Sequence, residues 1–209
     1  AVGAKIGLQA DWDQFADSWR QGYYSGLARI NAGENDWKLV DAIHRERLNL
    51  LLDEHGMAVG LSELEKQDLN RAWHRLEPWP DSVEGLGHLK SKFIVAALSN
   101  GNISLLTNMA KYGNLPWDCI LSAELANRYK PDHRVYQRAA ELLDLPGHKI
   151  LMVAAHSTDL HGAKGAGLKT ALVARPDEFG PGRGKDLEPN PEFDLFAKDF
   201  NHLAEILGC

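Results

Sequence analysis

The sequence predicts an α/β fold in which a parallel sheet is flanked by helices and preceded by a purely helical region. Two observations lead to this prediction. After about residue 80, short apolar runs alternate with amphipathic stretches, as strands and helices do in a parallel sheet. Before that point, helical patterns follow one another without a convincing strand.

The two regions meet at the proline-rich stretch Pro78–Pro80. We expect residues 1–10 to be the end of a helix or a linker, 11–78 a helical domain and 79–209 the α/β core. In the helical domain, aromatic and aliphatic residues recur at three- and four-residue steps, which predicts one apolar helix face. That face consists of Trp12, Phe15, Trp19, Tyr23 and Leu27.

Two further helices are predicted in the helical domain. After a loop over 31–36, the pattern indicates a helix over Trp37–His55. Another is predicted over Ser62–Leu76, where Ser62 and Glu65 have the spacing of a capping box.

Four strands are predicted in the core. They cover Phe93–Leu98, Ile120–Ser122, Ile150–Ala154 and Thr170–Ala174. The Gly- and Pro-rich segment 179–191 is expected to be a long loop, and its glycines lack the spacing of a phosphate-binding Walker loop.

Composition limits the class of partner. The 209 residues carry a formal net charge of −6, which argues against a nucleic-acid partner. No apolar stretch approaches the roughly 20 residues that span a bilayer, so no membrane partner is expected. The chain has two cysteines, which fit a reducing compartment better than a disulfide scaffold. A cytoplasmic location is therefore expected.

The run Ile94–Gly101 stops abruptly at Ser99 and Asn100. In parallel sheets, ligands bind beyond the carboxyl ends of the strands. Ser99 and Asn100 are therefore candidates to face a ligand. The alternative is a strand that simply ends in a polar turn.

Three segments in order carry a family resemblance: LSNG at 98–101, YKPDHRVY at 129–136 and VAAHSTDLHGAKGAG at 153–167. They resemble the later motifs of the haloacid dehalogenase superfamily, and most closely those of the type II 2-haloacid dehalogenases. The resemblance implies a Rossmann-like parallel sheet core with an inserted helical cap. It also implies hydrolytic dehalogenation of short-chain (S)-2-haloalkanoic acids through an aspartyl ester, without a cofactor.

The first motif of that family is not found. It is a strand near the N-terminus that ends in a nucleophilic aspartate, roughly Phe-Asp-x-Tyr/Phe-Gly-Thr. Asp11 and Asp13 do not match it, since they precede an amphipathic helix and follow no apolar strand. We therefore expect the first core strand to be absent and the nucleophile to lie upstream of Ala1. The chain alone is then expected to be inactive, and an inactive truncated scaffold is one alternative.

Three residues match the family's catalytic groups, and a fourth is a further catalytic candidate. Lys130 matches a lysine whose ammonium keeps the nucleophilic carboxylate ionised. Asp159 matches the acid that orients this lysine and the hydrolytic water, and Tyr136 a tyrosine that holds the two together. His156 departs from the family pattern. Its imidazole is either a general base for ester hydrolysis or only a hydrogen-bonded side chain.

The resemblance also implies substrate contacts. Ser99 and Asn100 match the motif that binds the substrate carboxylate. Asn100 is also expected to face the halide. Arg20 matches the cap arginine, whose permanent charge suits an anion, although most helix arginines are simply solvated. Trp37 matches an aromatic wall of the substrate pocket, although an aromatic residue that begins a helix is more often part of the core.

Ala155 bears on the choice between reactions. In the superfamily's phosphatases, the position four residues before that of Asp159 carries an acid that ligates Mg²⁺. Alanine cannot ligate a cation that needs oxygen ligands. We therefore expect no metal site, although another superfamily hydrolase such as a phosphatase is a second alternative. Relatives are often dimers, which leaves a homodimer open.

Overall fold

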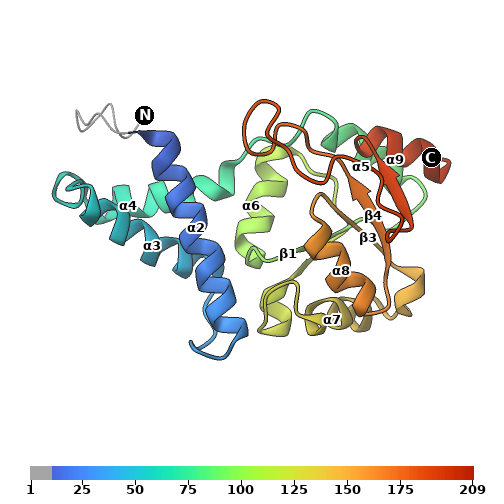
Figure 1. The fold of residues 1–209 in the computed structure, drawn as a ribbon, viewed down its shortest axis with the longest axis horizontal. Helices are drawn as coiled ribbons and strands as arrows, with labels where there is room; N and C mark the ends of the chain where they lie inside the picture. Colours follow the sequence, from blue (N-terminus) through green and yellow to red (C-terminus); the bar gives the residue numbers. More distant parts are fainter. Residues whose placement is uncertain (1–10) are drawn as a thin grey trace. The chain divides into compact units, whose positions relative to one another are not determined.

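The computed structural model describes residues 11–209. It forms two compact units, one ending at Leu76 and the other running from Glu77 to the C-terminus (Figure 1). The expected segment over residues 1–10 lies outside the described residues. Within the described part, no helix is both long and apolar enough to cross a membrane.

The N-terminal unit is helical, as predicted. It contains α2 (Trp12–Asn31), α3 (Val40–Glu54), a 3₁₀ turn (Ala58–Gly60), α4 (Glu63–Asn70) and a second 3₁₀ turn (Arg71–Arg75). Its core joins α2 to α3 and to the chain that follows, through Phe15, Trp19, Leu48, Leu51, Leu52, Met57 and Leu61.

The start of α2 follows from its first residues. The Asp11 carboxylate accepts a hydrogen bond from the N–H of Gln14, and Asp13 lies in the first turn. Both place negative charge at the positive end of the helix dipole. Phe15 and Trp19 of the predicted apolar face are buried, whereas Trp12 is 43% exposed. Trp12 therefore does not belong to the core.

Two predicted helix boundaries in this unit are wrong. α3 begins at Val40 rather than Trp37, and Leu39 precedes it without a side-chain cap. No capping side chain marks this start, so the sequence carries no capping signal for it. The capping box of Ser62 and Glu65 is confirmed, but α4 ends at Asn70 and continues as a 3₁₀ turn.

The C-terminal unit has the alternating order that the sequence predicts. Its strands are β1 (Ala96–Ser99), β2 (Cys119–Ser122), β3 (Leu151–Ala154), β4 (Lys169–Val173) and β5 (Leu195–Ala197), and all their pairings are parallel. Its helices are α5 (Ser82–Lys90), α6 (Ile103–Gly113), α7 (His133–Leu143), α8 (Ser157–Gly165) and α9 (Phe200–Leu207), with 3₁₀ turns at Ala123–Ala126 and Gly147–Lys149.

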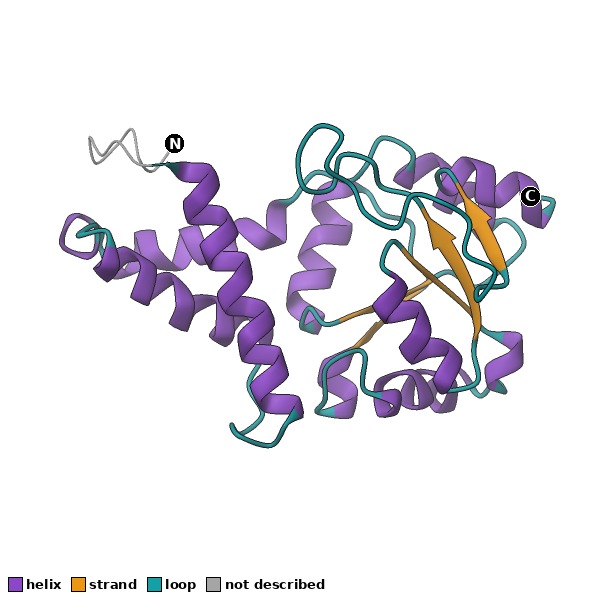
Figure 2. Cartoon of the chain, viewed as in Figure 1, coloured by secondary structure: helices purple, strands orange, loops and turns teal. Residues whose placement is uncertain are grey.

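Helices cover both faces of the strands (Figure 2). On one face, Leu151 and Val153 pack with α5 and α9. On the other face, Met152 packs with Tyr136 of α7 and with α8. This alternation along β3 is the period-two pattern of a strand between two helical layers.

The strands form two separate sheets, β1-β2 and β3-β4-β5. Within residues 11–209, β1 pairs only with β2 and β3 only with β4, so each has an edge without a strand partner. Both strands are mostly half-buried, whereas β4 is buried after its first residue. Leu98 of β1 nevertheless packs in the same hydrophobic cluster as Met152 of β3.

The strands differ most from the predicted ones at β1 and β5, whereas the bounds of β2, β3 and β4 differ by one residue. β1 begins at Ala96 rather than Phe93, and both Phe93 and Ile94 are exposed. β5 was not predicted, because it covers only three residues and is flanked by Asp194 and Lys198. The segment 179–191 contains no helix or strand, as predicted.

Candidate active site

A group of polar side chains is centred on Asp159, in the first turn of α8. Nζ of Lys130 lies 2.5 Å from Oδ2 of Asp159, and the Tyr136 hydroxyl donates to Oδ1 at 2.6 Å. The Lys130 and Asp159 side chains are 13% and 15% exposed, and Tyr136 is fully buried. Exclusion of water strengthens the attraction between the opposite charges.

Tyr136 acts as a fixed donor. Its burial raises the pKa of its hydroxyl far above the ordinary value, and the nearby charge of Asp159 raises it further. The hydroxyl therefore stays protonated at neutral pH and keeps one carboxylate oxygen engaged. The other oxygen is left to face Lys130.

Lys130 is held by the segment that follows β1. Oδ1 of Asn100 accepts a hydrogen bond from the Lys130 N–H at 2.7 Å, and the Asn100 amide nitrogen donates to the Lys130 carbonyl at 3.4 Å. Nζ of Lys130 also donates to the carbonyl oxygen of Leu98 at 2.9 Å. The ammonium thus joins the carboxyl end of β1 to the start of α8.

Ser99 ends β1 beside this group. Its Oγ accepts a hydrogen bond from the N–H of Gly101 at 3.1 Å. A hydroxyl that accepts one bond can still donate its own proton. Ser99 is half-buried and belongs to the edge of the sheet where ligands of parallel α/β folds bind.

His156 lies at the end of β3 and precedes α8 directly. Its Nε2 is 2.9 Å from both carboxylate oxygens of Glu178, which follows β4 in the chain. The imidazole is 42% exposed, whereas the Glu178 side chain is 17% exposed. This partner was not identified from the sequence, since Glu178 lies 22 positions after His156, beyond α8 and β4.

Arg20 and Trp37 belong to the N-terminal unit. Nε of Arg20 donates to the Tyr24 hydroxyl at 3.3 Å, and its guanidinium lies 5.8 Å from the centre of the Tyr24 ring. Trp37 is half-buried in the extended segment before α3. Since it does not begin that helix, the helix-start position predicted for it is wrong.

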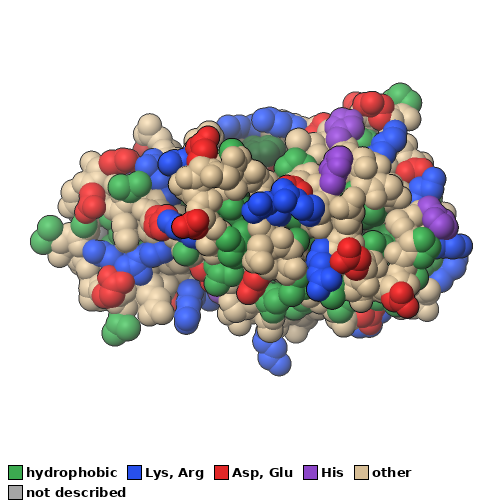
Figure 3. All heavy atoms as spheres, turned by 90° about the horizontal axis from the view of Figure 1, so that it is seen from below, with side chains coloured by type: hydrophobic (Ala, Val, Ile, Leu, Met, Phe, Trp, Pro, Cys, Tyr) green, Lys and Arg blue, Asp and Glu red, His purple; other side chains and the backbone are tan. Residues whose placement is uncertain are grey.

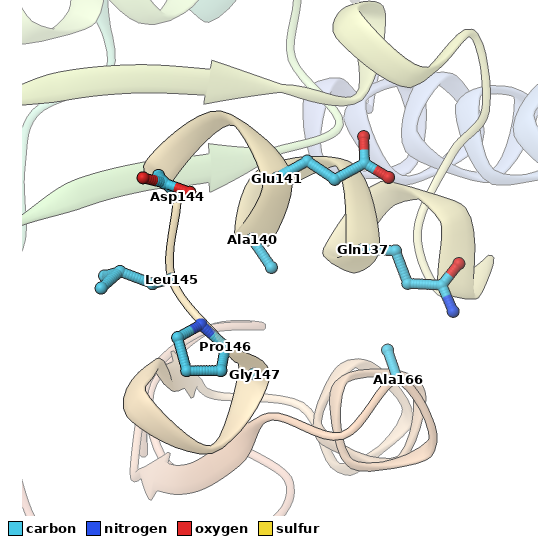
Figure 4. Close-up of a pocket in the computed structure, with 8 residues that line it drawn as sticks. All are labelled: Gln137, Ala140, Glu141, Asp144, Leu145, Pro146, Gly147 and Ala166. Carbon is cyan, nitrogen blue, oxygen red and sulfur yellow. The ribbon is translucent and has the colours of Figure 1, made fainter.

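The hollow drawn in Figure 4 does not include this group. It measures about 450 Å³ and is lined by the second half of α7, the segment 144–147 and Ala166. Segment 144–147 leads into β3, so the hollow lies near the amino end of that strand. Asp159 and His156 follow the carboxyl end of the same strand.

A metal centre has few candidate ligands here. Within residues 11–209, no three His, Cys, Asp or Glu side chains are grouped as metal ligands. Ala155 follows β3 directly and offers only a methyl group beside the cluster. The group can instead supply one ammonium, one carboxylate and several hydrogen-bond donors.

Comparison with known proteins identifies the family of the chain. A family model described as haloacid dehalogenase-like hydrolase matches residues 4–167. The chain belongs to this family. The superfamily resemblance of the three sequence motifs is therefore confirmed, and so is the α/β fold class.

Several haloacid dehalogenase relatives are similar in sequence. The (S)-2-haloacid dehalogenase 1 of Pseudomonas sp. (strain CBS-3) is 34% identical over 180 residues, which are 80% of this chain and 75% of the relative. The (S)-2-haloacid dehalogenase 4A of Burkholderia cepacia is 34% identical over 68% of this chain. The chain spans 58% of the length of this second relative.

Solved haloacid dehalogenase structures share the fold. A defluorinating L-2-haloacid dehalogenase superposes with a TM-score of 0.95 and is 40% identical, covering 100% of this chain and 85% of the other. Another L-2-haloacid dehalogenase gives a TM-score of 0.88 at 43% identity, covering 93% of this chain and 85% of the other.

Proposed function

We propose that the protein hydrolyses the carbon–halogen bond of short-chain (S)-2-haloalkanoic acids through an aspartyl-ester intermediate. The observation that carries the proposal is the half-buried ion pair of Lys130 and Asp159 at the carboxyl ends of the strands, with Tyr136 on the second carboxylate oxygen. The names of the relatives support the substrate class.

The nucleophile of this reaction is a carboxylate from outside residues 11–209. Two features of the C-terminal unit support a further strand as its carrier. β1 and β3 have backbone edges without a strand partner in the described chain, yet share one hydrophobic cluster. Lys130 contacts both the Leu98 carbonyl of β1 and Asp159 after β3, so a strand between them would end beside its ammonium.

The first step is a displacement at C2 of the substrate. A carboxylate oxygen forms the new C–O bond as the C–halogen bond breaks, the halide leaves with the electron pair, and the carbon inverts. The Lys130 ammonium keeps this carboxylate ionised. Arg20 binds the departing halide, the Ser99 hydroxyl binds the substrate carboxylate and Trp37 forms a wall of the pocket.

Asn100 binds the substrate carboxylate and faces the halide in this scheme. Both ends of its amide also contact the Lys130 backbone, so it helps to place Lys130 as well.

The second step hydrolyses the ester. Water, activated beside Asp159 and His156, attacks the ester carbonyl carbon, and the 2-hydroxy acid leaves as the carboxylate of the nucleophile is restored. Preorganised charges supply the stabilisation of both steps, so no cofactor is required.

We also propose that the protein is located in the cytoplasm. Cys119 and Cys209 are free thiols in the structure, which suits a reducing, cytoplasmic compartment.

We further propose a homodimer. A mass of twice that of one chain in sedimentation or light scattering would support it, and a monomer mass would contradict it.

Release of halide and release of phosphate, each measured with and without EDTA, test the function. The protein with its native upstream residues should release halide from (S)-2-chloropropionate in both conditions, and should release no phosphate from phosphate esters. Residues 1–209 alone should release neither. Metal-dependent phosphate release would favour the phosphatase alternative, and halide release by residues 1–209 alone would contradict an external nucleophile.

A further inference from the structure

We propose that Glu178 is a positioning residue that fixes His156 as the general base of ester hydrolysis. This inference rests on the proposed dehalogenase function and assigns a role to a residue outside the three segments that carry the family resemblance. It starts from the contact between Nε2 of His156 and both oxygens of Glu178, each at 2.9 Å.

The contact determines which ring nitrogen carries the proton. An ionised carboxylate can only accept hydrogen bonds. Nε2 of His156 must therefore be the protonated nitrogen that donates to Glu178, and Nδ1 carries the lone pair of the neutral ring. A carboxylate that orients a histidine in this way also stabilises the imidazolium that forms when the ring takes a proton.

Glu178 is held in place from both sides in the chain. Three residues earlier, the buried Arg175 forms two hydrogen bonds to Asp81, at 3.0 and 2.9 Å. Eight residues later, Asp186 accepts hydrogen bonds from the N–H and the hydroxyl of Ser157, at 3.1 and 2.7 Å. The segment that carries Glu178 is thus fastened directly beside His156.

The location of His156 suits a base. It lies two residues after β3 and directly before α8, and its carbonyl oxygen accepts the N–H of Asp159 at 3.1 Å, so it lies one helical turn from the carboxylate that faces Lys130. Its side chain is 42% exposed, which gives water access to the ring. Asp186, on the segment that follows Glu178, interacts electrostatically with His156, and Asp159 lies three positions after His156 in the chain.

In this step His156 carries a proton from water to the leaving alkoxide. Water gives a proton to Nδ1 of His156 while its oxygen adds to the ester carbonyl carbon. The tetrahedral intermediate expels the alkoxide of the 2-hydroxy acid, which takes the proton from the imidazolium. The regenerated carboxylic acid of the nucleophile then ionises, and its proton is the one released with each halide.

The test separates formation of the ester from its hydrolysis. Glu178→Ala and Glu178→Gln are compared with the wild type, all with the native upstream residues, using (S)-2-chloropropionate. A rapid-quench halide assay gives the first turnover, the steady-state rate gives kcat, and intact-protein mass spectrometry detects the ester.

For Glu178→Ala we expect a burst of one halide per active site at the wild-type rate, followed by a kcat at least about 10-fold lower. The ester should accumulate in this variant. His156→Ala should also show the full burst, a lower kcat and accumulation of the ester. The kcat of the double variant should be no lower than that of His156→Ala, since both residues act on one step. The kcat of Glu178→Gln should lie between those of Glu178→Ala and the wild type, because the glutamine amide oxygen still accepts a hydrogen bond from Nε2–H.

Glu192→Gln is the matched control, since Glu192 forms a similar but exposed pair with His161 at 3.2 Å. It should match the wild type in every readout. An unchanged kcat for Glu178→Ala, or an equal loss of burst and kcat, would overturn the inference, the latter because it indicates a structural role. No halide from the wild type itself would overturn the proposed function, and the inference with it.

Discussion

At the scale of single residues, the site is organised around one ammonium. Lys130 contacts a carboxylate, a strand carbonyl and, through its backbone, the Asn100 amide. Only the contact between Lys130 and Asp159 could be predicted from the sequence, because both residues belong to the family motifs. The contact with the Leu98 carbonyl involves a backbone atom, which no residue pattern specifies.

Substitution of Lys130 should stop the chemistry without unfolding the protein. Lys130→Gln removes the charge that keeps the nucleophile ionised, and we expect halide release to fall by about 10²-fold or more. Lys169→Gln is the matched control, because Lys169 forms a more exposed ion pair with Asp194 at 3.0 Å. An initial rate above half of the wild-type value for Lys130→Gln would contradict the assignment.

At the scale of elements, each unit offers a largely buried polar side chain whose titration or removal should be measurable. In the N-terminal unit it is His44 of α3, which is 4% exposed, stacks on Trp73 at 4.6 Å and has a buried Nδ1 without a hydrogen-bond partner in the described residues. In the C-terminal unit it is Asp81, before α5.

Acid should destabilise the N-terminal unit through His44. Burial lowers the pKa of His44 from 6.5 to about 4. Because the folded-state pKa lies below the unfolded one, the stabilisation is complete above pH 6.5 and is lost as the pH falls towards 4. A shift of this size corresponds to about 3 kcal/mol.

Urea unfolding between pH 7.5 and 4.5, followed by the fluorescence of the tryptophans, checks this expectation. The free energy of unfolding should fall with pH in the wild type and fall less in His44→Phe, which keeps an aromatic ring on Trp73. Parallel pH profiles for the two proteins would argue against a role of His44.

Removal of Asp81 should destabilise the C-terminal unit. Burial alone would raise the pKa of Asp81, but hydrogen bonds from Arg175 and the Phe200 N–H, together with the Arg175 charge, lower it below its usual value. Asp81→Ala leaves the buried Arg175 without its partner, which costs about 3–5 kcal/mol. Thermal unfolding should show a lower Tm, whereas Asp118→Ala, at the exposed pair with Lys90, should shift it little.

Whether an element could be predicted depends on the length and the apolar pattern of the residues that form it. β3 and β4 were found within a residue of their bounds, because a buried parallel strand needs a continuous apolar run. β5 was missed because three residues cannot carry such a pattern. Glu178 was missed as well, since its place beside His156 depends on contacts far apart in the sequence.

At the scale of the whole molecule, charge does not mark the site. The face in Figure 3 shows acidic and basic side chains interspersed, and its visible Lys and Arg side chains form no continuous patch. The charges proposed for catalysis are few and mostly shielded from water, as Lys130 and Asp159 are. Electrostatic effects of this kind depend on burial and placement more than on net charge.

The most direct test of the account is a single turnover in ¹⁸O-labelled water, with the protein and its native upstream residues in excess over (S)-2-chloropropionate. If an aspartyl ester forms and water attacks its carbonyl carbon, the lactate of the first turnover takes its new oxygen from the protein. That lactate should be unlabelled, and one ¹⁸O should appear in an aspartate side chain. Labelled lactate in the first turnover, with no label in the protein, would contradict the account.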